Sequence, residues 1–145
     1  MTSHILTRQV IEPHEVPTMV SSWVTAKVLA SPAVSGAEKM SAVSLYFNPG
    51  QGHARHNHPA SEQFICVIGG VGEMMIEDDA GRPVKTAIGP GSLVTIPRGA
   101  FHSTFNTGWE PLRILAVYSP AGPEEAMRTS EEFVVLAPDV VPARP

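Results

Sequence analysis

The sequence predicts an all-β domain, a sandwich or barrel of short strands, and three observations support this prediction. Fourteen prolines and twelve glycines are spread along the chain and divide it into short pieces. These pieces are rich in Val, Ile, Leu, Phe, Tyr and Thr, the residue types that favour strands. The middle of the sequence contains no long segment with helical periodicity. Many short strands at regular spacing are typical of sandwiches and barrels.

Length and composition agree with one folded unit, which we place at residues 1–145. Of these 145 residues, 43% are hydrophobic, enough for a core, and only 17% are charged, with a net charge of −4. The sequence has no Lys/Arg cluster to hold phosphate, so we expect neither nucleic acid nor a membrane as a partner. Cys66 is the only cysteine, which excludes an intrachain disulfide. No signal peptide or membrane-spanning stretch is visible, and we expect a soluble cytoplasmic protein.

The strands follow one another with turn residues between them. The turn sequences are NPG, GG, DDAGRP, GPG, PRG and NTGWEP. The predicted strands are 23–30, 40–47, 62–68, 71–77, 84–88, 92–96, 102–106 and 112–118. One short C-terminal helix is predicted at 123–132, with a proline near its start. The barrel core is therefore expected at about 40–118, after an N-terminal strand extension (1–39) and before a helix and tail (119–145).

The stretch GHARHNHPASEQF, residues 52–64, concentrates histidines. Side chains two positions apart on a strand share a face, so His56 and His58 should lie about 6–7 Å apart. Pro59 ends this run, and Glu62 opens the next apolar segment, where its carboxylate can fold back on the same ion. Two imidazoles and a carboxylate suit a divalent transition metal and leave coordination positions open. The competing interpretation is a solvated turn that happens to contain histidines.

A second stretch, GSLVTIPRGAFHSTFN, residues 91–106, can bring a further ligand to this pair. Pro97 stops the strand ladder, Gly99 permits a tight bend, and His102 then starts another strand. Such a return places His102 near the first two histidines. Taken alone, His102 is more simply interpreted as an ordinary half-buried histidine.

Together the two stretches resemble both signature motifs of the cupins. The first motif is matched by Gly50, His56, His58, Glu62 and Gly69, and the second by Gly91, Pro97, Gly99, His102 and Asn106. The resemblance implies a small jelly-roll barrel of two sheets with one divalent metal ion per subunit inside. It implies that His56, His58, Glu62 and His102 are the metal ligands. Fe(II), Mn(II), Zn(II), Ni(II) and Co(II) all accept such a ligand set.

Strand parity predicts which other side chains line the pocket. If Glu62 and His102 face inward, so do Phe64, Cys66 and Ile68 on one strand and Thr104 and Asn106 on the other. Both parities stay open for two more strands. In 40–47 the inward residues are either Met40, Ala42, Ser44 and Tyr46 or the residues that alternate with them. In 112–118 the inward residues are either Leu112, Ile114, Ala116 and Tyr118 or Arg113, Leu115 and Val117.

Four side chains near the predicted metal receive individual predictions. Tyr46 is the candidate catalytic residue, as a proton donor or a substrate contact. His53 has the opposite parity to His56, so we expect it at the rim of the site. Arg55 should point away from the metal, and Cys66 is interpreted as a small buried filler rather than a nucleophile.

The function predicted from these features is that of a metal-dependent enzyme acting on a small, mainly apolar carbonyl or phenolic compound. The first version is a non-heme iron dioxygenase-like enzyme or a related oxidoreductase. The alternative version is a non-redox isomerase, lyase or cyclase that uses Zn or Mn. A cupin that only binds a metal or a small ligand is a further alternative, and the presence of all four motif ligands favours the enzyme.

The segment SWVTAKVLA, residues 22–30, predicts an apolar strand that must pair or be covered. It can close the protein's own sheet, or it can be exchanged with a neighbouring subunit, as the resemblance implies for many small relatives. We expect a homodimer with residues near 20–30 in the interface and a separate metal site in each subunit.

Overall fold

The computed structural model describes residues 9–142. The strands are β1 Thr18–Val20, β2 Thr25–Ala30, β3 Ser41–Phe47, β4 Gly52–His56, β5 Glu62–Gly69, β6 Gly72–Glu77, β7 Pro83–Ile88, β8 Leu93–Ile96, β9 His102–Asn106, β10 Leu112–Ser119 and β11 Val134–Leu136. The helices are the 3-10 turn η1 Pro13–Glu15 and the short α1 Pro32–Ser35 and α2 Glu125–Thr129. In the described part of the chain, no helix has the length and hydrophobicity that crossing a bilayer requires.

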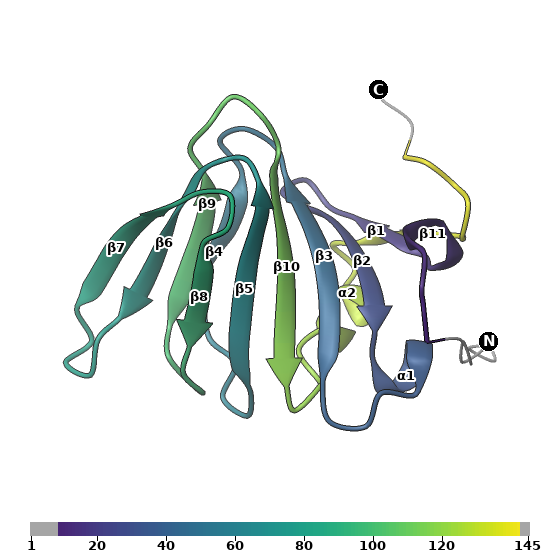
Figure 1. The fold of residues 1–145 in the computed structure, drawn as a ribbon, viewed down its shortest axis with the longest axis horizontal. Helices are drawn as coiled ribbons and strands as arrows, with labels where there is room; N and C mark the ends of the chain where they lie inside the picture. Colours follow the sequence, from purple (N-terminus) through teal and green to yellow (C-terminus); the bar gives the residue numbers. More distant parts are fainter. Residues whose placement is uncertain (1–8, 143–145) are drawn as a thin grey trace.

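The strands form two antiparallel sheets, which confirms the predicted all-β fold class (Figure 1). The larger sheet has the order β11-β1-β2-β3-β10-β5-β8, and the smaller one has the order β4-β9-β6-β7. The predicted C-terminal helix is present as α2, shorter than the predicted range. β1, β4 and β11 were not among the predicted strands. β2 lies between β1 and β3 of its own chain, which is the first of the two arrangements considered for the early apolar strand.

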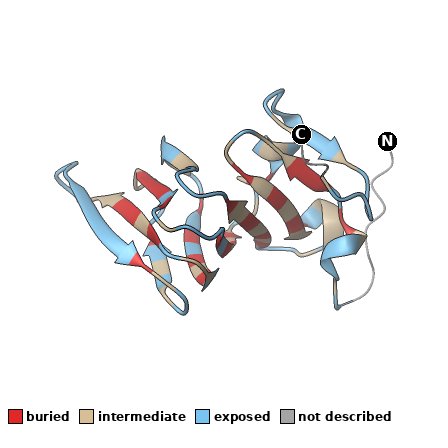
Figure 2. Cartoon of the chain, turned by 90° about the horizontal axis from the view of Figure 1, so that it is seen from above, coloured by how far each residue is buried: buried red, intermediate tan, exposed pale blue. Residues whose placement is uncertain are grey.

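The hydrophobic core lies between the sheets, and the alternation of side chains determines which residues reach it. In β3, every second residue from Ser41 to Phe47 is buried, and the residues between them are half-buried on the outer face. Seen from above, buried residues gather on the inner strands while β7 is largely exposed (Figure 2). Each large apolar side chain that is removed from water stabilises the fold by about 1.5–3 kcal/mol. The largest of these side chains are Phe47, Ile65, Met74, Ile96, Leu112 and Ile114.

Two strand parities that the sequence left open are resolved by this packing. In β10 the inward residues are Leu112, Ile114, Ala116 and Tyr118. In β3 the inward residues are Ser41, Val43, Leu45 and Phe47, which alternate with the set that contains Tyr46. Tyr46 is therefore half-buried on the outer face, opposite Arg113 of β10, and its expected place in the pocket is wrong. The larger aliphatic and aromatic side chains of β3 fill the core, which turns Tyr46 outward.

The segment after β10 returns to the far edge of the large sheet. α2 lies behind this sheet, and β11 pairs with β1 (Figure 1). Met127 and Phe133 pack against the core, and the ring of Phe133 meets Trp23 edge to face at 5.8 Å. The indole Nε1 of Trp23 donates a hydrogen bond to Glu132. These contacts hold the C-terminal segment against the early part of the chain.

Candidate metal centre

Three histidines from two strand ends meet inside the fold. His56 ends β4, His102 starts β9, and the two residues are directly paired in the small sheet. His58 follows β4, and its ring centroid lies 4.9 Å from that of His56 and 5.3 Å from that of His102. One ring nitrogen of each histidine lies within 4.8 Å of the others. This group could hold a divalent transition metal ion.

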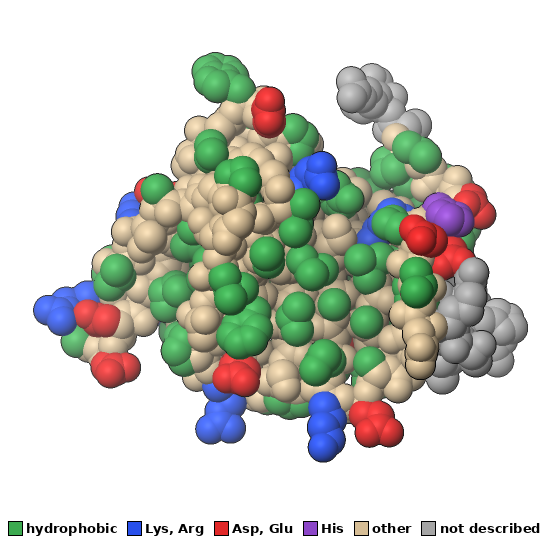
Figure 3. Space-filling view, viewed as in Figure 1, with side chains coloured by type: hydrophobic (Ala, Val, Ile, Leu, Met, Phe, Trp, Pro, Cys, Tyr) green, Lys and Arg blue, Asp and Glu red, His purple; other side chains and the backbone are tan. Residues whose placement is uncertain are grey.

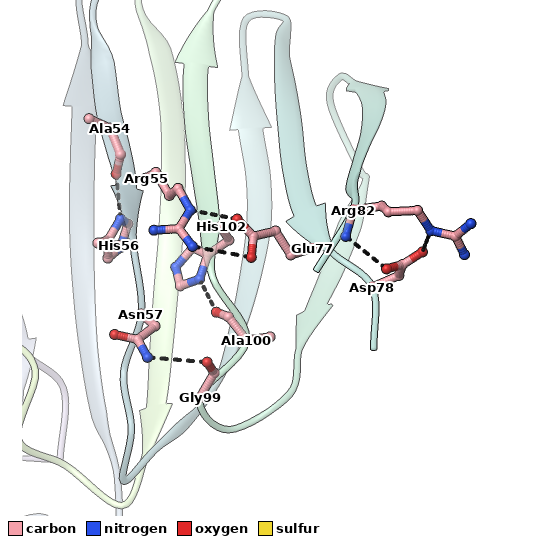
Figure 4. A network of polar contacts seen from close by, with 10 residues as sticks. All are labelled: Ala54, Arg55, His56, Asn57, Glu77, Asp78, Arg82, Gly99, Ala100 and His102. Atoms are coloured by element: carbon pink, nitrogen blue, oxygen red, sulfur yellow. Dashed lines mark hydrogen bonds and ion pairs between the residues drawn. The ribbon is translucent and has the colours of Figure 1, made fainter. Parts of the chain in front are cut away.

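Backbone contacts between two loops place His58 in this group. The carbonyl of His58 accepts a hydrogen bond from the amide of Gly99 at 3.0 Å. The side-chain amide of the neighbouring Asn57 donates to the carbonyl of Gly99 at 3.2 Å (Figure 4). The turn that Gly99 makes before β9, with φ at 80°, therefore holds the loop after β4 beside His102.

Hydrogen bonds orient two of the rings and leave their other nitrogens free. Nδ1 of His56 lies 2.7 Å from the carbonyl oxygen of Ala54, and Nδ1 of His102 lies 2.9 Å from that of Ala100 (Figure 4). An Nδ1–H that donates to a carbonyl leaves the lone pair on Nε2. The Nε2 atoms of His58 and His102 are buried and have no hydrogen-bond partner within residues 9–142. Such unpaired buried acceptors fit a metal ion, because a bound cation would satisfy them.

The environment keeps these imidazoles neutral. Burial lowers the pKa of His58 to about 4, and the neighbouring His56 and His102 lower it further in the same direction. Burial likewise lowers the pKa of His102 to about 4, against an opposing hydrogen bond to the Ala100 carbonyl. The pKa of His56 is also lowered by burial. Neutral imidazole is the form that coordinates metal, so the site is ready for an ion at neutral pH.

The structure does not bring Glu62 to the histidines. Glu62 is exposed on the outer face of β5, whereas its neighbour Gln63 faces inward and is only 4% exposed. Successive residues of a strand point to opposite faces, so only one of the two can reach the interior. The side-chain oxygen Oε1 of Gln63 is buried and has no hydrogen-bond partner among the described residues. The expectation that the carboxylate of Glu62 completes the group of histidines is therefore corrected.

Gln63 also lies on the side of the barrel where the histidines are. It is paired with Tyr118 of β10, so the two side chains share the inner face. The ring of Tyr118 in turn contacts that of His58 edge to face, at 5.1 Å between centroids. Gln63 was missed because the sequence alone did not fix the parity of β5.

The sequence does contain one signal that favours Gln63. Glu62 is separated from Gly69 by six residues, and Gln63 is separated from Gly70 by the same number. Gly70 has φ at 81°, and a Cβ there would lie 2.5 Å from the carbonyl oxygen of Pro111, whereas a Cβ at Gly69 would meet nothing. The glycine that the backbone requires is therefore Gly70, and counting back from it leads to Gln63.

The other residues of β5 that were expected to face inward also face outward, whereas the residues expected to face inward in β9 are buried. Phe64 and Ile68 are exposed on the outer face, and Cys66 is half-buried there. In β9, Thr104 and Asn106 are buried with His102. The amide of Asn106 donates to two backbone carbonyls, at 2.9 and 2.7 Å, so this side chain has a structural role.

His53 was expected at the rim of the site, and the structure places its ring against that of His56. A β-bulge interrupts the pairing of β4 with β9 between His53 and His56, so both rings lie on one side. The ring of His53 stacks on that of His56 at 3.5 Å and on that of Trp23 at 4.4 Å between centroids. Burial, and next the nearby imidazoles, lower the pKa of His53 to about 3. Trp23 and His53 thus form an aromatic wall beside His56.

The other two features near the histidines are an ion pair and a buried hydroxyl group. Arg55 points away from them, as expected, and forms an ion pair with Glu77 (Figure 4). Tyr118 faces inward, and burial followed by the charge of Glu124 raises the pKa of its hydroxyl. Glu124 is itself 1% exposed and accepts hydrogen bonds from Ser41 and from the amide of Gly122.

An apolar cleft lies at the opposite edge of the small sheet from β4, and no histidine is among its lining residues. It has a volume of about 440 Å³ and lies between β6, β7 and β8. Its main apolar lining is Met74, Ile76, Ile88, Leu93 and Val94. Ile76 is directly paired with His102, so the cleft begins one strand away from the histidines.

Comparisons with known proteins agree with this geometry. The cupin domain family matches residues 44–118. The chain is 30% identical over 97 residues to Protein SchB of Streptomyces halstedii, covering 67% of each chain. It is 27% identical over 117 residues to the putative germin-like protein 9-2 of Oryza sativa subsp. japonica, covering 80% of this chain and 54% of that protein. It is 34% identical over 74 residues to the glucose-6-phosphate isomerase of Thermococcus kodakarensis, covering 51% of this chain and 38% of that enzyme. The chain thus spans about half of the germin-like protein and less of the isomerase.

Solved structures share the fold at lower sequence identity. KdgF from Halomonas sp. superposes with a TM-score of 0.61 at 20% identity, covering 73% of this chain and 88% of that chain. A tryptophan variant of oxalate decarboxylase from Bacillus subtilis superposes with a TM-score of 0.73 at 20% identity, covering 87% of this chain and 33% of that chain. At this level of identity the similarity concerns the fold alone.

Proposed function

This chain belongs to the cupin family, and from that premise we propose that it is a metal-dependent enzyme acting on a small organic molecule. The observation that carries the proposal is the group formed by His56, His58 and His102. Two of these rings present buried Nε2 atoms without hydrogen-bond partners in the described structure. Burial without pairing is costly for polar atoms, and a bound cation offsets that cost.

We further propose Gln63 as the fourth protein ligand. Its Oε1 atom is buried and unpaired among the described residues, and its strand neighbour Tyr118 contacts His58. Three imidazoles and one amide are all neutral donors, so none of them offsets the charge of a divalent ion. A site of this kind favours a substrate that presents an anionic oxygen, such as an enolate, a phenolate or a carboxylate.

The substrate class follows from the surroundings of the histidines. A bound divalent ion would act as a Lewis acid on a substrate oxygen, and a redox-active one would also exchange electrons with dioxygen. The apolar cleft, which begins at Ile76 on the strand next to His102, suits the hydrocarbon part of a small carbonyl or phenolic compound. Tyr118 replaces Tyr46 as the candidate hydroxyl near the reacting group, because it faces inward and contacts His58. Its raised pKa keeps this hydroxyl protonated, as a hydrogen-bond donor to a substrate oxygen requires.

Two reaction types remain within the proposal. The first is the dioxygenase-like reaction, for which the open coordination positions beside three imidazoles leave room for substrate and O₂. The second is a non-redox isomerase, lyase or cyclase reaction. The 34% identity to a protein named glucose-6-phosphate isomerase favours retaining this second candidate.

Metal analysis of the purified protein tests the ligand set. We expect stoichiometric metal in the parent protein and almost none in His102→Ala. Glu62→Ala is the matched control, since its side chain is exposed, and it should retain the metal. Equal metal content in the parent and in His102→Ala would refute the proposed site.

Turnover assays with the metal-loaded protein test the reaction. 1,3-Diketones, phenols and keto acids are supplied with and without air, and both O₂ consumption and product are followed. Turnover that consumes O₂ supports the dioxygenase, and turnover without air supports the non-redox candidate. Tight binding of these compounds to the metal-loaded protein without any turnover would refute the enzyme and indicate a binding module.

A further inference from the structure

His56 and His102 are held by the same local arrangement on two different strands. In each case the ring Nδ1 lies near the carbonyl oxygen of an alanine two residues earlier, at 2.7 Å for His56 and 2.9 Å for His102. The two tripeptides are Ala54-Arg55-His56 and Ala100-Phe101-His102. The histidines are paired directly in the small sheet, and their ring centroids lie 4.2 Å apart. The residue in the middle of each tripeptide is therefore placed to influence a metal-binding ring from outside the group of ligands.

Arg55 and Phe101, the two middle residues, contact each other directly. The guanidinium carbon of Arg55 lies 3.8 Å from the centroid of the Phe101 ring. The same guanidinium group donates two hydrogen bonds to the carboxylate of Glu77 (Figure 4). The backbone amide of Glu77 donates to the carbonyl of Phe101 at 2.9 Å. These three residues thus form a closed group, which we call the outer brace.

The outer brace acts on position rather than on overall stability. The side chains of Arg55 and Glu77 are 55% and 16% exposed, and ion pairs this accessible to water contribute little to folding. A guanidinium group is planar and rigid, so it can stack on a ring and hold a carboxylate in a fork at the same time. These contacts fix where Phe101 lies, and Phe101 connects the Ala100 carbonyl to His102 along the chain.

A second contact ties the same segment to His58. The side-chain amide of Asn57 donates to the Gly99 carbonyl at 3.2 Å, and the Gly99 amide donates to the His58 carbonyl at 3.0 Å. Arg55 and Asn57 alternate with the two histidines of this part of the chain. Both of them reach the segment 99–101 that leads into β9. The loop before β9 is therefore held at two points by the segment that carries the other two histidines.

We propose that Arg55 is a positioning residue of the metal centre, which acts through Phe101 on the direction of the His102 ring. The inference rests on the proposed metal site and adds a residue that touches neither the ion nor the substrate. When the guanidinium group is removed, Phe101 and the Ala100 carbonyl can shift, and the His102 ring loses the contact that fixes its orientation. Contacts of this kind outside the ligands change metal affinity by about 10–100-fold.

Titration with Co(II) measures the effect on the metal centre. We expect Arg55→Ala to bind Co(II) about tenfold more weakly than the parent, and the visible absorption bands of the bound ion to change with the ligand geometry. Arg82→Ala is the matched control, because Arg82 is paired with Asp78 in the hairpin between β6 and β7 and its side chain is 78% exposed. Figure 3 shows charged side chains projecting from this hairpin at the left border of the molecule. This variant should bind Co(II) as the parent does.

Two further variants separate positioning from a general loss of structure. Arg55→Lys keeps the positive charge but lacks the planar fork, so its affinity for Co(II) should lie between those of the parent and Arg55→Ala. Phe101→Leu removes the ring contact, and in this background Arg55→Ala should have little further effect on the affinity. Urea unfolding of the metal-free protein should give nearly the same free energy for Arg55→Ala and for the parent.

Nuclear magnetic resonance of the metal-free protein tests the outer brace independently of the metal. The protein is kept in a chelator above about pH 7.5, where ordinary imidazoles are neutral. The nitrogen shifts of the parent should show His102 as a single tautomer with the proton on Nδ1, as its bond to Ala100 requires. Arg55→Ala should show a mixture of both tautomers, and Arg82→Ala should resemble the parent. If the parent binds no Co(II), the proposed metal site fails, whereas this comparison still decides whether Arg55 positions the ring.

Any of three results would overturn the inference. The first is an unchanged Co(II) affinity and spectrum in Arg55→Ala, or an equal loss of affinity in Arg82→Ala. The second is a full additional loss of affinity when Arg55→Ala is introduced into Phe101→Leu. The third is a single Nδ1–H tautomer of His102 in both the parent and Arg55→Ala.

Discussion

Acidification of the metal-free protein should destabilise it strongly through its buried histidines. Burial lowers the pKa of both His58 and His102 to about 4 in the folded state, against 6.5 for the unfolded chain. Between these two values the unfolded state binds more protons than the folded state. Stability therefore rises with pH in this window, is intact above about pH 6.5, and falls as the pH drops toward 4.

The magnitude follows from these pKa values. At about pH 5, an imidazole with a folded pKa of 4 and an unfolded pKa of 6.5 costs about 2 kcal/mol of unfolding free energy. His102 is 1% exposed, so water screens its charge little. His58 is half-buried and contributes less, so the two histidines together bring the loss to about 3 kcal/mol. This loss is a large share of the roughly 5–15 kcal/mol by which most domains are stable.

Urea unfolding at a series of pH values in the presence of a chelator measures this dependence. We expect the unfolding free energy to fall steadily from about pH 6.5 to about pH 5. Each buried histidine contributes a slope of about 1.4 kcal/mol per pH unit. His102→Gln should reduce the slope by that amount, whereas His14→Gln, at an exposed position, should not. A stability that is flat across this range, or a slope that His102→Gln leaves unchanged, would refute the reasoning.

Three further predictions concern single positions. Gln63→Ala should weaken metal binding by about tenfold or more in a calorimetric titration, and Glu62→Ala should leave it unchanged, because only Gln63 faces the interior. Gly70→Ala should cost about 1–3 kcal/mol in urea unfolding, since φ is 81° there, while Gly69→Ala should cost little. Asn106→Ala should cost about 2–4 kcal/mol in the same assay, because two backbone carbonyls lose their buried donor.

Most of the barrel was predictable because its strands are short runs of apolar and β-branched residues bounded by turn residues. The segments that became β3, β5 and β10 were placed to within a few residues, but their nearly continuous apolar sequences left the inward face undetermined. β4 was not predicted as a strand, since its sequence, GHARH, is polar and its pairing with β9 is long-range. β1 and β11 have three residues each, too few for a period to show.

The site was predictable in position but only partly in composition. Two histidine stretches meet because β4 pairs with β9, and the spacing of the motifs carried that information. The prediction that Glu62 faces the histidines was wrong because Glu62 and Gln63 are adjacent polar residues. A shift by one residue along a strand turns the side chain to the opposite face of the sheet. The parity argument for His53 did not include the β-bulge between His53 and His56, which no residue type in GHARH indicates.

The pairing of β1 with β11 has a consequence for how the protein folds and opens. These two strands come from opposite ends of the chain, and Thr18 pairs with Leu136 across almost its whole length. Closing so long a loop is entropically costly, so we expect β1 and β11 to pair only after β3, β10 and β5 have assembled. The same edge should open first in the native state. Its backbone amides should then exchange with deuterium through local fraying, whereas the amides at the centre of the sheet should exchange only through global unfolding.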